Sequence, residues 1–164
     1  MVQVGNAKKV KSRTHADSIR VRGFFRIRIG ENGKIVGDSG WKENTVVNDG
    51  FDQYIIRSLG AIAGSKTVGY VNLGTGTAPN ATHTALDGET GTRKTTSNSV
   101  VASKTLQCAA NFGSSDHPGG TPSLSNIGLF NTDAGGTLLC GNTYATSAWQ
   151  SNQAVSITYQ LRFS

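Results

Sequence analysis

Hydrophobic and polar residues alternate along several short stretches of the chain, most clearly over residues 154–163. The apolar positions of this stretch are Val155, Ile157, Tyr159, Leu161 and Phe163. A period of two predicts a strand with one buried and one solvent-facing side. Two further apolar runs precede it, one ending at Phe130 and one starting at Thr137. We therefore predict three antiparallel strands in one C-terminal sheet, which needs a second layer to cover it.

The same alternation over residues 19–29 places arginines along one side of another predicted strand. Its buried side would carry Ile19, Val21, Phe25, Ile27 and Ile29. Its outer side would carry Arg20, Arg22, Phe24, Arg26 and Arg28. Same-side neighbours in a strand lie roughly 6.6 Å apart, so these guanidinium groups repel one another. Their clustering suggests an acidic partner.

Three interpretations of this arginine row remain open. The guanidinium groups can form bidentate pairs with Asp and Glu of a partner protein. They can follow a phosphate backbone while Phe24 stacks on a base of a nucleic acid. The row can also be a solvent-facing strand that arginine keeps soluble.

Turn signals divide the rest of the chain into further strands. Asn-Gly within residues 31–34 predicts a hairpin, and residues 41–47 and 67–73 are each typical of a strand. The Ser- and Thr-rich stretch 95–112 predicts one long strand, or two strands with a bulge. Together with residues 19–47 these strands would supply the second layer.

One segment has helical spacing instead. Residues 51–62 follow Asn48 and Asp49, either of which can cap a helix N-terminus. Gly60 or Gly64 can close its C-terminus. We predict one short helix, packed at one end of a sheet.

Composition and charge add a basic arm to this picture. The 164 residues include 21 glycines and only 16% charged residues, which favours many short strands within one domain. We assign residues 18–164 to a single β-sandwich domain and residues 1–17 to an extended basic arm. Residues 1–30 hold eight basic side chains against Asp17 alone, so the remaining body is nearly neutral. Such a segment is suited to an acidic surface.

The arm itself is either a solvated tail or a segment that becomes ordered on a neighbouring subunit. With the arginine row it forms our predicted partner-binding site. The residues of this site are Lys8, Lys9, Lys11, Arg13, Arg20, Arg22, Phe24, Arg26 and Arg28.

The two cysteines, Cys108 and Cys140, are too few for a disulfide scaffold. Both lie in predicted strands, where they form either buried free thiols, a cross-strand bridge or a reactive site. The longest apolar run is too short for a membrane span, and the N-terminus lacks the apolar region of a secretory signal.

Chemistry-bearing residues do not gather into a recognisable motif. The Gly-rich segment 74–92 lacks the Gly-Lys-Ser/Thr ending of a phosphate loop, so we treat it as a surface loop. The histidines, His15, His83 and His117, show no metal-ligand spacing. Asp116 with His117, and Asp87 with Glu89, fit solvated loops better than a catalytic site. We therefore expect no catalytic activity, no cofactor and no metal.

Several motifs, taken in order, carry a resemblance to a known family. They are Asn44 through Gly50 before the helix, Leu73-Gly74-Thr75-Gly76 with Pro79 and Leu86, Ile127-Gly128-Leu129-Phe130, and the alternating last strand. In this order, residues 41–163 resemble the small β-sandwich structural proteins of tailed bacteriophages, which include capsid decoration or cement proteins and related tail modules. The resemblance implies a mostly β, antiparallel, jelly-roll-like sandwich and a non-enzymatic role in the virion.

On this resemblance we expect a virion protein, made in the host cytoplasm, that decorates a capsid by binding the major capsid protein or another virion protein. A tail or fibre-attachment module is the alternative. A nucleic-acid-binding protein using the arm and the arginine row belongs to another class, as does a carbohydrate-binding sandwich displaying Trp41, Tyr144 and Trp149. Free strand edges favour a homo-oligomer.

Overall fold

The computed structural model describes residues 19–164 as a mostly β protein with one short helix. The strands form an antiparallel sheet that is nearly closed into a barrel. The strands are β1 (Val21–Glu31), β2 (Lys34–Asp38), β3 (Lys42–Val46), β4 (Tyr70–Gly74), β5 (Glu89–Thr95), β6 (Ser97–Ala102), β7 (Thr105–Phe112), β8 (Ser123–Phe130), β9 (Leu138–Ala148) and β10 (Ala154–Phe163). Their order is β5-β4-β8-β9-β3-β1-β10-β7-β6, and β2 pairs with one end of β1.

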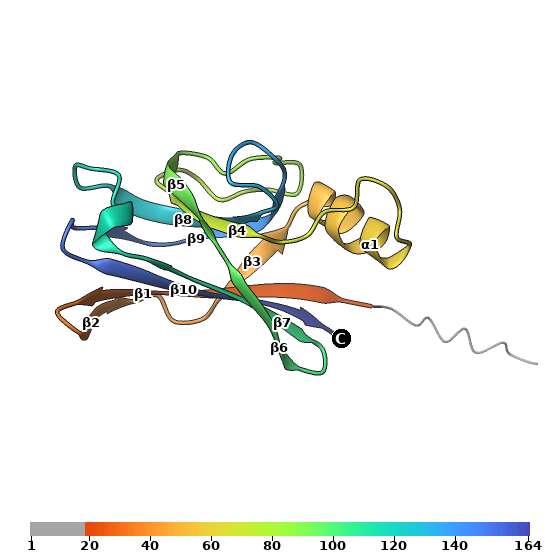
Figure 1. The fold of residues 1–164 in the computed structure, drawn as a ribbon, viewed down its shortest axis with the longest axis horizontal. Helices are drawn as coiled ribbons and strands as arrows, with labels where there is room; N and C mark the ends of the chain where they lie inside the picture. The colour runs from red at the N-terminus through yellow and green to blue at the C-terminus, as the bar shows by residue number, and fades with distance from the viewer. Residues whose placement is uncertain (1–18) are drawn as a thin grey trace, which may run out of the picture.

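The sheet folds over on itself, so that strands face one another across a core. Figure 1 shows β4, β5, β8 and β9 above β1, β2, β6, β7 and β10, with β3 crossing between them. β3 pairs with β1 through Asn44 and Gly23, and with β9 through Thr45 and Gly141. Gly23 is required at this crossing, because a Cβ there would overlap the Asn44 side chain.

The predicted alternation of the first and last strands is confirmed. β1 and β10 pair in register from Val21 and Phe163 to Gly30 and Ala154. Their inward side chains include the largest buried residues of the lower layer, Phe25 and Tyr159. Burying apolar side chains from both layers stabilises the fold by about 25 cal/mol per Å² of apolar surface removed from water. These two central strands therefore hold the lower layer together.

The predicted C-terminal sheet of three strands is wrong. β8 and β9 do pair with each other, but β10 lies between β1 and β7 in the other layer. The connection after Ala148 therefore crosses from one layer to the other. Alternation marks residues 154–163 as a strand, but it contains no information about which neighbour the strand pairs with.

The polar middle of the chain forms two strands with a bulge, one of the two arrangements predicted for residues 95–112. These strands are β6 and β7, which pair across a tight turn at Ser103 and Lys104, with the bulge between Val100 and Ala102. β5 begins inside the segment predicted as a long loop, at Glu89, and continues beyond it to Thr95. None of the residues of β5 or β6 is fully buried, so neither strand shows the apolar alternation that reveals a half-buried strand.

The hairpin and the helix lie where they are expected. Asn32 and Gly33 both have positive φ, as a two-residue hairpin turn requires. The helix consists of a π-helical segment η1 (Gly50–Ile56) followed by α1 (Arg57–Leu59), and it ends at Gly60. A short 3-10 helix η2 (Ser114–Asp116) follows β7. The predicted side-chain cap of the first helix is wrong, because Asp49 makes no capping hydrogen bond.

Buried contacts anchor the helix to the upper layer and enclose both cysteines. Tyr54 of η1 is buried and donates its hydroxyl hydrogen to the carbonyl of Thr137. Cys108 and Cys140 are both buried free thiols, so neither the bridged nor the exposed reactive form is present. Burial raises the pKa of the Cys108 thiol to about 12, which keeps it protonated at neutral pH.

Candidate partner-binding surface

The predicted arginine row lies on the outer side of β1. Arg22, Phe24, Arg26 and Arg28 point away from the core, and Arg20 directly precedes the strand. The backbone of Arg20 exchanges hydrogen bonds with that of Ser164, which fixes it beside the end of β10. The remaining predicted site residues, Lys8, Lys9, Lys11 and Arg13, lie outside the described residues.

Arg162, which the sequence did not single out, and Trp41, considered there for carbohydrate binding, join this row. The β1–β10 register places Arg162 directly opposite Arg22. The guanidinium carbon of Arg162 lies 4.4 Å from the centre of the Phe24 ring and 5.8 Å from that of Trp41, within the range of cation–π attraction. Arg22 approaches the Phe24 ring at 5.4 Å. We call the whole surface the arginine–aromatic face, comprising Arg20, Arg22, Phe24, Arg26, Arg28, Trp41 and Arg162.

Two carboxylates of this chain already neutralise part of the row. Glu43 of β3 accepts a hydrogen bond from Arg22 Nε at 2.9 Å. Asp38 of β2 binds Arg26 through both carboxylate oxygens, at 2.9 Å and 2.5 Å, and lies 3.5 Å from Arg28 Nε. Three of the four arginines of the predicted row, Arg22, Arg26 and Arg28, thus have acidic partners within the chain. The flanking strands β2 and β3 provide these acids.

The pKa values of the carboxylates reflect this pairing. The hydrogen bond from Arg26, followed by one from the Gly40 backbone N–H, holds the pKa of Asp38 well below its usual range. The hydrogen bond and charge of Arg22 lower the pKa of Glu43. Both carboxyl groups are therefore ionised at neutral pH.

The other two arginines keep most of their donors available. Among residues 19–164, neither Arg20 nor Arg162 forms an ion pair with a carboxylate. Within the described residues, the Arg162 guanidinium donates only to the side-chain oxygen of Gln160, at 2.8 Å and 3.2 Å. With five arginines against Asp38 and Glu43, the face carries a net positive charge. It can accept carboxylates of another molecule at Arg20 and Arg162.

The polar residues weighed as a catalytic site serve the fold. Asp116 pairs with Lys94 through both oxygens at 2.8 Å and accepts the Gly113 N–H. His117 Nδ1 accepts the Gly119 N–H, so its Nε2 donates to the Trp149 carbonyl at 2.9 Å. Both side chains fix the loop between β7 and β8.

Asp87 and Glu89 are likewise held by neighbouring elements. Asp87 accepts the Thr77 N–H and hydroxyl, each at 2.9 Å, which ties the two ends of the surface loop together. Glu89 pairs with Arg93, whose guanidinium lies 3.5 Å from the centre of the Phe130 ring. The expectation of solvated loop residues is confirmed for Asp87, which is exposed in the loop, and is wrong for Glu89, which is half-buried at the start of β5.

The aromatic residues weighed for carbohydrate binding do not share a surface. Trp149 and the Tyr144 hydroxyl are buried, and Trp149 packs edge-on against Phe112. Only Trp41 is substantially exposed, at 43%. One exposed ring does not form the stacking platform that this function needs.

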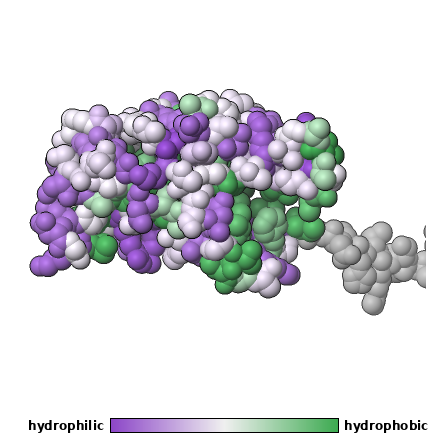
Figure 2. All heavy atoms as spheres, viewed as in Figure 1, coloured by the Kyte–Doolittle hydropathy of each residue, from purple (hydrophilic) through white to green (hydrophobic). Residues whose placement is uncertain are grey.

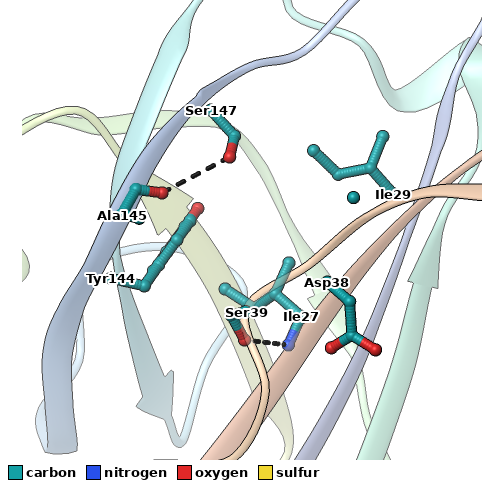
Figure 3. Close-up of a pocket in the computed structure, with 8 residues that line it drawn as sticks. Ile27, Ile29, Asp38, Ser39, Tyr144, Ala145 and Ser147 are labelled. Carbon is teal, nitrogen blue, oxygen red and sulfur yellow. Dashed lines mark hydrogen bonds between the residues drawn. The ribbon is translucent and has the colours of Figure 1, made fainter.

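A small cavity lies beside the arginine–aromatic face, between β9 and the segment that follows β2. Figure 3 shows Tyr144, Ala145 and Ser147 on one side and Ile27 and Ser39 on the other. Its volume is about 60 Å³, well below the ≈ 300–1,000 Å³ typical of small-molecule sites. The cavity is therefore too small to hold an organic ligand.

Residues 19–164 offer neither a metal cluster nor a membrane-spanning helix. No group of three or more His, Cys, Asp or Glu side chains there is arranged to hold a metal ion. No helix in this part of the chain has both the length and the apolar character needed to cross a membrane.

Comparison of the chain with protein-family models, with curated proteins and with solved structures finds no match. The functional argument therefore rests on the residues and their geometry.

Proposed function

We propose that this chain is a non-enzymatic structural subunit of a bacteriophage virion, which binds the major capsid protein or another virion protein through its arginine–aromatic face. The observation that carries the proposal is the pair of arginines, Arg20 and Arg162, that carry no carboxylate partner on a positively charged, sheet-formed surface. The jelly-roll-like sandwich implied by the resemblance belongs to the same proposal. The two facing layers of strands are compatible with it.

The resemblance of residues 41–163 provides the virion context. Its motifs fall on the scaffold: Ile127–Phe130 lies in β8, Leu73 and Gly74 end β4, and the alternating strand is β10. Residues of these motifs build the core, whereas the arginine–aromatic face lies mostly on β1, outside the resemblance. This division fits a shared framework that carries a partner-specific surface.

The geometry favours a protein partner over a nucleic acid. A flat array of arginines can bind the carboxylates of another protein bidentately. The Phe24 ring, which the sequence offered for base stacking, is already contacted by the guanidinium groups of Arg22 and Arg162. Asp38 and Glu43 would also repel a continuous phosphate backbone.

Co-sedimentation with purified phage particles that lack this subunit tests the proposal. The variant Arg20→Ser/Arg162→Ser removes the two arginines that make no ion pair and leaves the pairs of Asp38 and Glu43 intact. We expect the wild-type chain to bind particles and the variant to bind at least about tenfold more weakly, which corresponds to about 1.4 kcal/mol.

The matched control is Lys34→Ser, which removes one positive charge at an exposed position outside the face and is compared with Arg162→Ser alone. It should bind like the wild-type chain. Equal loss in both variants would show a general charge effect, and no loss in the arginine variant would exclude the face. A steep salt dependence on short DNA, with no particle binding, would favour the nucleic-acid class.

A further inference from the structure

An apolar cleft opens at the end of the molecule that carries the helix. It has a volume of about 260 Å³ and lies between the helical segment and the ends of β7 and β10. Its apolar lining includes Ile55, Val68, Leu106, Leu161 and Phe163. A second hollow, bounded by Val100, Lys104 and Phe163, shares Leu106 and Phe163 with the first. The two hollows form one continuous groove.

The groove continues onto exposed apolar side chains. Leu59 of α1 is 80% exposed and Ile62 is 51% exposed on one side. Val100 and Val101 of β6 are 76% and 47% exposed on the other. Figure 2 shows hydrophobic surface gathered at this end of the molecule, on the helix and on the β6–β7 hairpin. Contiguous apolar surface of this kind marks an interaction site more often than isolated exposed side chains do.

The neighbouring strand β6 adds unsatisfied backbone groups to this apolar surface. β6 ends the strand order and pairs only with β7 in the part of the chain the structure describes. Every residue from Ser97 to Ala102 is exposed, and none carries a charge. An uncharged open edge is a template for another strand, because its outward N–H and C=O groups lack partners.

We propose that β6 and the adjoining groove form a two-fold interface between two copies of this chain, with their β6 strands paired antiparallel. Val100 pairs with Leu106 across β6 and β7, so both side chains lie on the groove side of the sheet. Antiparallel pairing of two β6 strands about a two-fold axis near Val100 brings the two Val100 side chains together. Each then covers the mouth of the other copy's groove.

Two features favour a second copy over a different protein. Antiparallel pairing of a strand with itself is self-complementary, which is the requirement of a two-fold interface. The edge strand β2 at the other end differs, because it carries Lys34 and Asp38, charges of the kind that natural proteins use to block edge pairing. β6 has no such protection, and its apolar residues adjoin the groove they would cover.

Sedimentation velocity of the full chain over about 1–300 µM tests this interface. We expect the wild-type chain to dimerise and Val100→Lys to raise the dissociation constant at least about tenfold. Val36→Lys is the matched control, since Val36 is 56% exposed on β2. It should dimerise like the wild-type chain. Thermal unfolding of each variant at low concentration verifies that the fold is intact.

If Val100→Lys disturbs the β6–β7 hairpin, a charge-complementation experiment still tests whether two Val100 side chains meet in the dimer. Val100→Lys and Val100→Glu should each be monomeric, and their equimolar mixture should dimerise because the two side chains meet across the axis. A wild-type chain that stays monomeric throughout overturns the proposal and leaves the groove to another occupant. Equal loss in Val36→Lys, or no association in the mixture, overturns the β6-centred arrangement.

Discussion

Two arginines of this protein stack on phenylalanine rings, and their surroundings give them opposite roles. The side chain of Arg93 is only 6% exposed, over Phe130. It pairs with Glu89 and donates to the carbonyls of Thr132 and Gly135. Arg162 is exposed over Phe24 and, within the described residues, its guanidinium donates only to Gln160. Both arginines stack on a phenylalanine ring, but the Arg93 guanidinium uses its donors within the chain, whereas the Arg162 guanidinium keeps donors free.

The difference shows how to separate structural from functional arginines in this fold. Arg93 ties β5 to the turn between β8 and β9, and its hydrogen bonds are all made within the chain. Removing it would leave the half-buried Glu89 carboxylate and Thr132 carbonyl without this donor, which is costly. Arg162 stabilises little, since exposed charges are screened by water, but its free donors are available to another molecule.

The largest effect that separates the two arginines is expected on stability. Arg93→Met should lower the free energy of unfolding by about 3 kcal/mol, the low end of the range for breaking a buried pair. The low end applies because the Glu89 side chain keeps 24% of its surface exposed. Arg162→Met should change it by less than about 0.5 kcal/mol, as for most surface substitutions. Denaturant titration of both variants measures the difference.

Arg93→Lys sharpens this test, because lysine keeps the charge but lacks the planar group that serves Glu89 and two carbonyls together. It should recover only part of the loss. Equal stability of Arg93→Met and Arg162→Met would contradict the distinction between the two sites.

The second effect is a pH dependence of stability, which we expect at the Arg93–Glu89 pair. Burial raises the pKa of Glu89, but hydrogen bonds from Arg93 and Asn72 and the charge of Arg93 outweigh it, so the net pKa is lowered. A lowered folded-state pKa means that Glu89 stabilises the fold fully above its unfolded pKa of about 4.3. This stabilisation is lost as pH falls through the folded-state value.

Glu89→Gln should therefore be less stable than the wild-type chain by about 1.5 kcal/mol at pH 7, the usual value of a hydrogen bond to a charged group. The gap should stay constant down to about pH 5 and then shrink as the pH falls through the lowered folded-state pKa of Glu89. Urea titrations of both proteins from about pH 7 to about pH 2.5 measure it. Other carboxylates titrate equally in both proteins, so a gap that persisted at low pH would assign the effect to packing.

The alternation of apolar and polar residues predicts a strand when every second side chain of that strand is buried. It does not predict strands that lack such a buried side. β1 and β10 were found because Phe25, Ile27, Ile157 and Tyr159 alternate with polar residues. β5 has no fully buried residue, so nothing in its sequence distinguishes it from the loop that precedes it. The pairing of β10 with β1 and β7 is set by the whole core, which no single stretch of sequence encodes.

The candidate site, like the fold, was predictable from the sequence only where a single strand defines it. The arginine row follows from the period of β1 alone, and the structure confirms its outward side. Arg162, Asp38 and Glu43 join the row only through the register of β10, β2 and β3. The sequence shows that these residues are charged. Only the alignment of neighbouring strands shows which of them pair with the arginines of the row and which add to it.

The smallest effect is expected where the chain's own acid competes with a partner. Asp38→Asn removes the carboxylate that binds Arg26 and Arg28 on the arginine–aromatic face. Stability should change little, because both members of the Asp38–Arg26 pair are about one-third exposed, at 31% and 30%. Affinity for labelled polyglutamate should rise roughly two- to fivefold at low salt, since two guanidinium groups become available. The rise should shrink as salt screens the charges.

Asp133→Asn removes the same charge from an exposed turn outside the face and should leave affinity nearly unchanged. Fluorescence anisotropy measures both variants. Equal tightening in the two variants would mean that net charge governs binding. Tightening confined to Asp38→Asn would localise binding to the arginine–aromatic face. In that case Asp38 occupies donors of Arg26 and Arg28 that could otherwise bind a partner, as the free donors of Arg162 already can.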